Sequence, residues 1–320
     1  MSHPHAEFPL GPFTPYDANP ILRPQGDGWE SSSVYNPAAV VKDDKVVLLY
    51  RAHADDIVSH VGLATSDDGI HFDRQPEPVL SPSEDYERHG CEDPRVTEID
   101  GTYYLTYSAY DGTHAQLCLA TSNDLFTWEK HGPLFPGFNT FEPHAENVPT
   151  PWSKAGAILA EPIDGRYLMY FGEGSIYHAW SDDLISWKPC SNDEPLMVPT
   201  GPGTFGEFLV EVGPPPVITN NGLILMLHNA AVKNPDGSVR YSCGQLLFDP
   251  ADPATILAQM NRPWLEPSTY EDTHGLVSNV TFVEGLVFFK DTWFAYYGQS
   301  DSTLGVATYK VGDRYSSLGS

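Results

Sequence analysis

A sequence unit that recurs five times constrains the fold of this 320-residue chain more than any other feature. Each unit opens on a short segment rich in proline, glycine or alanine, and then continues through strand-like apolar segments separated by turn residues. Four short strands per unit, with no long helical pattern, are typical of a β-propeller. A two-sheet sandwich is the competing fold, but it does not explain five like units. We therefore expect an all-β, five-bladed propeller whose units open at Asn36, Glu92, Lys154, Gly213 and Val283.

The last unit lacks a closing strand, and a candidate for it stands at the opposite end of the chain. The fifth unit ends after the segment Leu304–Tyr309, whereas Pro20–Pro24 has the proline-bounded pattern that closes the earlier units. An N-terminal strand that completed the last blade would close the ring and remove its exposed sheet edges. The expected organisation is an N-terminal tail over residues 1–18, a propeller over 19–312 and a C-terminal tail over 313–320.

The charge of the chain restricts its partners. Seventeen basic and 43 acidic residues give a net charge of −26 that is spread along the sequence, so nucleic acid is a poor partner. No apolar stretch has the length of a signal-peptide core or a membrane span, which predicts a cytoplasmic protein that does not enter membranes. Four widely separated cysteines suit reduced thiols. The sequence carries no signal for an oligomeric state.

Several motifs are better explained by structure than by chemistry. The segments that begin at Ser66, Ser122 and Ser181 read as turns closed by short polar side chains, so Asp67, Asp124 and Asp182 are not counted as catalytic. The histidines show no metal-ligand spacing, and neither a glycine-rich phosphate loop nor a nucleophile elbow is present. We expect no metal and no cofactor.

Polar residues recur at equivalent positions of the units, where propeller strands meet the central channel. The hexapeptide Gly90-Cys-Glu-Asp-Pro-Arg95 is the most informative, because it sets carboxylates and a guanidinium at the entrance of an inner strand. Carboxylates that converge with a cation and aromatic residues suit glycoside hydrolysis, which needs an acid and a base. The inner-strand candidates are Asn36, Asp93, Arg95, Lys154, Glu211 and Glu284, and the ends of the second strands add Arg51, Tyr110, Asp111, Glu173, His228 and Asp301.

These motifs resemble those of glycoside hydrolase family 130, a family of five-bladed mannoside phosphorylases and β-mannosidases. The resemblance spans roughly residues 19 to 310, and its most specific mark is the Glu-Asp-Pro-Arg motif at Glu92 to Arg95. It implies that Asp93 is the general acid and that its proton passes through a hydroxyl group of the bound mannose.

The resemblance also bears on the nucleophile. The family's phosphorylases are expected to hold phosphate with Arg, Lys and a His-Arg pair, whereas this chain keeps Arg95 and Lys154 but has Phe171-Gly172-Glu173 in place of that pair. A carboxylate there would repel phosphate. The expected activity is an inverting β-mannosidase, on β-1,2-linked mannosides, with Glu211 or Glu173 as the base and Glu284 next. A mannoside phosphorylase and a non-catalytic sugar-binding propeller are the alternatives.

Overall fold

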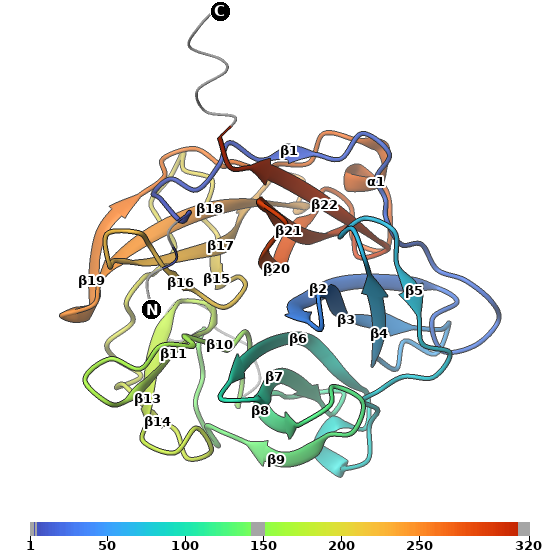
Figure 1. Ribbon diagram of the computed structural model, residues 1–320, viewed down its shortest axis with the longest axis horizontal. Helices are drawn as coiled ribbons and strands as arrows, with labels where there is room; N and C mark the ends of the chain where they lie inside the picture. Colours follow the sequence, from blue (N-terminus) through green and yellow to red (C-terminus); the bar gives the residue numbers. More distant parts are fainter. Residues whose placement is uncertain (1–2, 4, 142–150, 313–320) are drawn as a thin grey trace, which may run out of the picture.

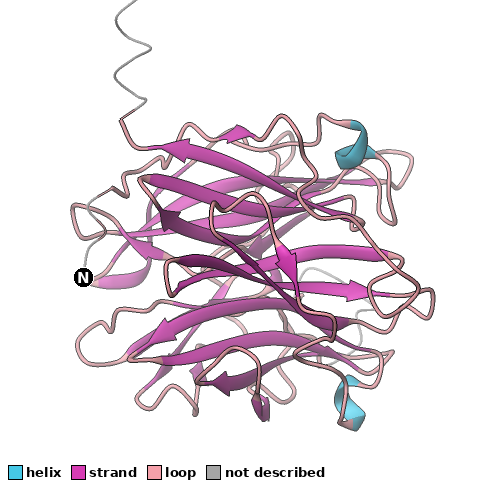
Figure 2. Ribbon diagram, turned by 45° about the vertical axis from the view of Figure 1, so that its right-hand side comes forward, coloured by secondary structure: helices cyan, strands magenta, loops and turns pink. Residues whose placement is uncertain are grey.

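The computed structural model describes residues 3, 5–141 and 151–312; the expected C-terminal tail, residues 313–320, lies outside the described residues. Five sheets stand around a central axis as the blades of a propeller, which confirms the predicted fold (Figure 1). Strands make up nearly all of the regular structure, as Figure 2 shows. Among the described residues, no helix has the length and apolar character needed to cross a bilayer.

The first three blades follow one another along the chain and are ordered from the channel outward. Their strands are β2 (Ser33–Lys42), β3 (Lys45–His53), β4 (His60–Ser66) and β5 (Asp73–Arg74); β6 (Gly90–Ile99), β7 (Thr102–Tyr110), β8 (Ala115–Ser122) and β9 (Glu129–Pro133); and β10 (Ala157–Ile158), β11 (Tyr167–Phe171), β13 (Tyr177–Ser181) and β14 (Lys188–Pro189). A short 3-10 helix, η1 (Asp85–Glu87), precedes the second blade.

The fourth and fifth blades complete the ring. The fourth contains β15 (Leu209–Val212), β16 (Val217–Ile218), β17 (Ile224–Lys233), β18 (Val239–Asp249) and β19 (Asp252–Gln259), and β12 (Glu173–Gly174) pairs with its inner strand. A one-turn helix, α1 (Tyr270–Thr273), leads to the fifth blade. That blade consists of β20 (Thr281–Phe289), β21 (Thr292–Gln299), β22 (Thr303–Lys310) and the N-terminal β1 (Thr14–Pro15).

The N-terminal segment closes the ring, as predicted, but the paired strand lies earlier than Pro20–Pro24. Thr14 and Pro15 of β1 pair with β22, while Leu22 forms only an isolated antiparallel bridge with Leu304. The two prolines that bound the predicted segment have no N–H group to donate to a ladder, which limits it to that bridge.

The described residues before β1, which lie within the expected N-terminal tail, pack against two blades. Leu10 is buried, and its backbone N–H and carbonyl exchange hydrogen bonds of 2.7 and 2.8 Å with the side-chain amide of Gln245. The His3 ring, expected in a mobile tail, lies 4.6 Å from the ring of Trp293. The segment therefore joins the fourth and fifth blades.

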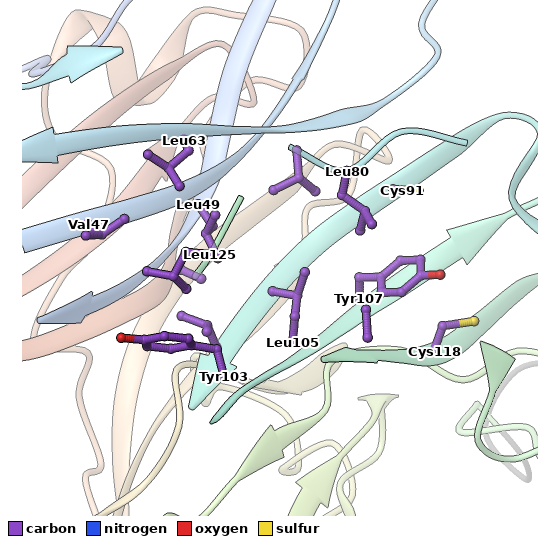
Figure 3. Close-up of a cluster of buried hydrophobic side chains, with 14 of the residues drawn as sticks. Val47, Leu49, Leu63, Leu80, Cys91, Tyr103, Leu105, Tyr107, Cys118 and Leu125 are labelled. Carbon is purple, nitrogen blue, oxygen red and sulfur yellow. The ribbon is translucent and has the colours of Figure 1, made fainter. Parts of the chain in front are cut away.

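Apolar side chains fill the space between each pair of neighbouring blades, in five clusters. Figure 3 shows the cluster between the first and second blades, where Leu49 and Leu63 face residues such as Leu105 and Tyr107. Alternating strand residues supply these faces, because successive side chains point to opposite sides of a sheet. The polar side chains at the bulges of the inner strands are not part of these apolar clusters and lie toward the central channel.

The serine-containing turns are structural, as predicted, although the carboxylate that closes two of them is the second aspartate. Asp68 accepts hydrogen bonds from the backbone of Ile70 and His71, and Asp124 and Asp183 do the same in their own turns. Asp67 and Asp182 instead form exposed ion pairs.

Candidate active site

Irregularities in the inner strands aim polar side chains at the channel. The register of β2 against β3 shifts at Asn36, that of β6 against β7 shifts at Asp93, and that of β20 against β21 shifts at Glu284. A bulge inserts an extra residue and redirects its side chain. Asn36 and Asp93 both have a φ of 49°, a left-handed conformation that asparagine and aspartate tolerate better than other side chains. A proline follows the bulged residue in β2 and β6, consistent with the restriction of proline within sheets to edges and bulges, whereas Gly285 follows Glu284 in β20.

A cavity of about 180 Å³ opens where the bulged strands converge. Part of its wall is polar, and the rest is apolar. The polar part contains seven of the predicted site residues: Asn36, Arg51, Asp93, Lys154, Glu173, Glu211 and Asp301.

Asp93 is the most heavily contacted group of the cavity. The Asn36 side-chain amide donates to its Oδ1 at 2.8 Å, Arg51 Nη1 lies 2.9 Å from the same oxygen, and Lys154 Nζ lies 3.1 Å from Oδ2. Burial alone would raise the pKa of Asp93, but the Lys154 ammonium and then the Arg51 guanidinium outweigh it and lower that pKa far below its usual range. The unliganded protein therefore holds Asp93 ionised.

Arg51 is shared between the two acidic residues of the Glu-Asp-Pro-Arg motif. Its Nη2 lies 2.7 Å from Glu92 Oε1, and its guanidinium stacks 4.7 Å from the centre of the Tyr35 ring. Burial raises the pKa of Glu92, although Arg51 opposes that rise. Glu92 was not among the predicted site residues, yet it fixes Arg51 in place beside Asp93.

Glu173 and Glu211 stand side by side on the far wall, because they are register partners of the β12–β15 pair. Trp152 Nε1 donates to Glu173 Oε2 at 2.8 Å, and Lys154 Nζ lies 3.9 Å from that oxygen. Glu211 is almost fully buried, and burial, followed by the neighbouring Glu173 carboxylate, raises its pKa well above the usual range. The pair thus combines Glu173, whose carboxylate is contacted by Trp152 and Lys154, with Glu211, whose raised pKa favours the protonated form.

Arg95 lies beneath the cavity and does not line it. Its Nε and Nη2 donate to the carbonyls of Gly213 and Val212 at 2.8 and 2.7 Å, and its Nη1 donates to the Asp93 carbonyl at 3.2 Å. The side chain is 1% exposed. Arg95, one of the predicted site residues, ties the Asp93 bulge of the second blade to the fourth.

Glu284 lies in the same floor. Its Oε1 is 3.0 Å from Arg95 Nη2, which also lies 3.9 Å from Glu211 Oε1, and its side chain is completely buried. Burial raises the pKa of Glu284 to about 8 despite the charge of Arg95. Glu284 is therefore removed from the residues that can contact a sugar in this cavity.

Three other predicted residues lie elsewhere. Asp111 accepts hydrogen bonds from the backbone of Thr113 and His114 in the turn after β7, and Tyr110 is also outside the cavity lining. His228 is completely buried against Phe205, with ring centres 5.8 Å apart. The second strand of a blade lies one step farther from the axis, so few of its side chains reach the channel. The Arg51 side chain reaches the cavity because it is long.

No sequence pattern predicted the residues of the apolar part of the wall. Tyr241 of β18 and Phe282 of β20 contact it with ring centres 6.0 Å apart, and Val277 and Val280 come from the segment before β20. Such residues look like ordinary core residues in a strand pattern. Together the two parts offer both hydrogen-bonding groups and apolar contact, which binding of a sugar ring requires.

Within the described parts of the chain, no group of three or more His, Cys, Asp or Glu side chains is arranged to hold a metal ion. The reactive groups of the cavity are its carboxylates, together with Arg51 and Lys154. Such a set can transfer protons to and from a bound polar molecule.

A family model for glycoside hydrolase family 130, described as beta-1,4-mannooligosaccharide phosphorylase, matches residues 18–314. The chain belongs to glycoside hydrolase family 130. The resemblance inferred from its motifs is therefore confirmed.

Relatives in family 130 include both phosphorylases and hydrolases. The 1,2-beta-oligomannan phosphorylase of Thermoanaerobacter sp. (strain X514) is 34% identical over 306 residues, covering 92% of this chain and 96% of that protein. A glycosyl hydrolase structure from Bacteroides ovatus is 33% identical, with a TM-score of 0.83 and coverage of 93% of each chain. A second structure is also 33% identical with a TM-score of 0.83, and the match covers 93% of this chain and 94% of that one. Its description reads "The GH130 family of mannoside phosphorylases contains glycoside hydrolases that target beta-1,2 mannosidic linkages in Candida mannan".

Proposed function

We propose that this family 130 protein hydrolyses β-1,2-linked mannosides with inversion at the anomeric carbon. The observation that carries the proposal is the Glu173–Glu211 pair on the cavity wall, which Lys154 connects to Asp93. The Glu173 carboxylate there can act as the base that activates water, and its charge would repel an inorganic phosphate. We favour the β-1,2 linkage because the descriptions of two relatives name it. One is a phosphorylase, and the other is a structure described with hydrolases that target this linkage.

The cations of the cavity give further support for water as the nucleophile. Arg51 is already paired with Glu92 and Asp93, and Lys154 lies between Asp93 and Glu173. Phe171, at the position expected for part of the phosphorylases' His-Arg pair, is buried in the core 4.5 Å from the ring of Phe135. A free cationic pocket for phosphate is thus missing from the described residues that line the cavity.

The acid in this mechanism is Asp93. It takes up a proton from solvent when substrate enters and separates it from Lys154 and Arg51, since those cations hold it ionised in the unliganded protein. The proton then reaches the leaving oxygen through a sugar hydroxyl group. Glu173, held by Trp152 and Lys154, accepts the proton of the attacking water, and its partner Glu211 remains protonated.

The separation of acid and base is bounded by the geometry. Lys154 Nζ is 3.1 Å from Asp93 Oδ2 and 3.9 Å from Glu173 Oε2, so these two oxygens are at most 7.0 Å apart, the sum of the two distances. Inverting enzymes that protonate directly space their carboxylates by about 6.5–9.5 Å. The maximum separation of 7.0 Å between the two oxygens falls at the lower end of that range. Because the proton of Asp93 would pass through a sugar hydroxyl group, the carboxylates need not have the spacing that direct protonation requires.

Phosphorolysis is the second candidate, because the 34% identical Thermoanaerobacter relative is a 1,2-beta-oligomannan phosphorylase. The two are separated by incubating the protein with β-1,2-mannobiose in phosphate-free buffer and again with phosphate. We expect free mannose in both, at the same rate. Turnover that needs phosphate and releases mannose 1-phosphate would overturn hydrolysis. A third candidate, sugar binding without catalysis, requires that the parent protein binds mannobiose and never cleaves it.

A further inference from the structure

The cavity is too small for a whole oligosaccharide. Its volume of about 180 Å³ lies below the roughly 300–1,000 Å³ of pockets that enclose ligands the size of a typical drug. A single sugar unit therefore enters, and further units of a longer chain must lie across the rim. The side chains of that rim decide which chain lengths are bound well.

One stretch of the rim is the segment between α1 and β20, and it is held firmly. Asp272 accepts hydrogen bonds from the backbone of Ser268 and Thr269 and from the side chain of Gln299, at 3.1, 2.9 and 2.7 Å. The Asp272 carbonyl also accepts from the Val280 backbone at 2.9 Å. The segment is thus anchored at both ends beside the cavity.

The middle of the segment lies flat against the end of β21. A Cβ atom at Gly275 would come within 2.3 Å of the Ser300 carbonyl oxygen, so only glycine permits this approach. The following N–H groups, of Leu276 and Val277, donate to Ser302 Oγ at 2.9 Å and to the Ser300 carbonyl at 3.2 Å. This contact places the two side chains next to Asp301, which lines the cavity.

Leu276 and Val277 are exposed although they are apolar and firmly placed. Their exposed fractions are 53% and 40%, and Val277 also lines the cavity with Val280 and Phe282. Isolated apolar residues on a surface need no explanation, but these two continue the apolar part of the cavity wall outward. A ligand that extends out of the cavity would cover them.

We propose that Leu276 and Val277 form a platform for the sugar units of a mannoside that remain outside the cavity, which makes them specificity-determining residues for oligosaccharides. The proposal rests on the function proposed above for the same site. The C–H faces of sugar rings lose water when they pack on apolar side chains, and this favours longer chains over a single mannoside.

The test compares binding of β-1,2-mannotriose with binding of methyl β-mannoside, which occupies the cavity alone. Dissociation constants are measured by ligand-observed NMR in an Asp93→Asn background, so that no sugar is consumed. The variants are Leu276→Ser, Val277→Ser and their combination. The matched control is Leu257→Ser on β19, since Leu257 is 47% exposed and does not line the cavity.

We expect the combined variant to reduce the preference for mannotriose over methyl β-mannoside about five- to tenfold, as the loss of a few buried methyl groups implies. The control should keep the preference of the parent. An unchanged preference in the combined variant, or an equal loss in the control, overturns the platform. Preferential binding without turnover by the active parent would sustain the platform and reject hydrolysis. Failure to bind either sugar would reject both.

Discussion

Trp152 Nε1 donates a hydrogen bond of 2.8 Å to Glu173 Oε2, and so fixes one of the two glutamates on the cavity wall. Trp152 also contacts Phe141, with ring centres 6.3 Å apart, which holds the indole in place. A tryptophan from the segment before β10 thus orients a carboxylate of β12.

Trp152→Phe removes that hydrogen bond and keeps an aromatic ring. A hydrogen bond to a charged group contributes about 1.5–3 kcal/mol, so we expect kcat to fall about tenfold or more. KM should change less, because the proposed partner of Glu173 is water. Steady-state kinetics with β-1,2-mannobiose measure both constants. A lower melting temperature with an unchanged kcat would show that the contact is only structural.

Asp93→Ala removes the proposed acid. General acid catalysis contributes about 10²–10⁴-fold, so kcat should fall by about a hundredfold or more. Circular dichroism of the variant checks that the fold is intact, since Asp93 is also the partner of Arg51 and Lys154. A folded variant with activity within tenfold of the parent would exclude Asp93 from the role.

The stereochemistry and the base are tested together. If water attacks opposite the leaving group, NMR of the first sugar released from a β-mannoside shows α-mannose before mutarotation. Azide should restore activity to Glu173→Ala, because a small anion can replace water where the base is missing. Rescue of Glu211→Ala instead would reverse the roles of the pair. Retention of the β configuration would contradict the whole scheme.

The buried carboxyl group of Glu284 should make stability depend on pH. Its pKa is raised from an ordinary value of about 4.3 to about 8, so between these values the unfolded chain releases a proton that the folded protein keeps. Rising pH in this window therefore favours unfolding at this site. The melting temperature of the parent, relative to that of Glu284→Gln, should fall from pH 5 to pH 8. A difference that stays constant with pH would contradict the prediction.

Because the N-terminal segment closes the ring, we expect deletion of residues 1–26 to lower the thermal stability of the protein strongly. The deletion removes β1, the Leu22 bridge and the buried side chains of Ala6 and Leu10, and it exposes the edge of β22. The melting temperature should drop sharply. Leu10→Ala is a milder variant that should cost about 2–5 kcal/mol of unfolding free energy. A truncated protein that melts like the parent would show that closure contributes nothing to stability.

The repeats of this sequence determined its architecture. Alternating apolar residues fix which faces of each sheet are buried, and the prolines and the serine-containing turns mark where strands stop, so these local rules predict five blades and a closing N-terminal strand. Asn36 and Asp93, each followed by a proline, lie at bulges of their strands, and both line the cavity.

Only the tertiary structure decided which polar residues meet. Tyr110, Asp111 and His228 occupy repeat positions like those of Arg51 and Asp301, yet only the latter two line the cavity. Repeat position fixes where a residue lies along its strand. Whether its side chain reaches the axis depends on its length, on bulges and on the packing of neighbouring blades. Burial raises the pKa of Glu211, whereas the charges of Lys154 and Arg51 outweigh burial and lower the pKa of Asp93. Both effects arise from contacts between blades, and no local sequence pattern encodes them.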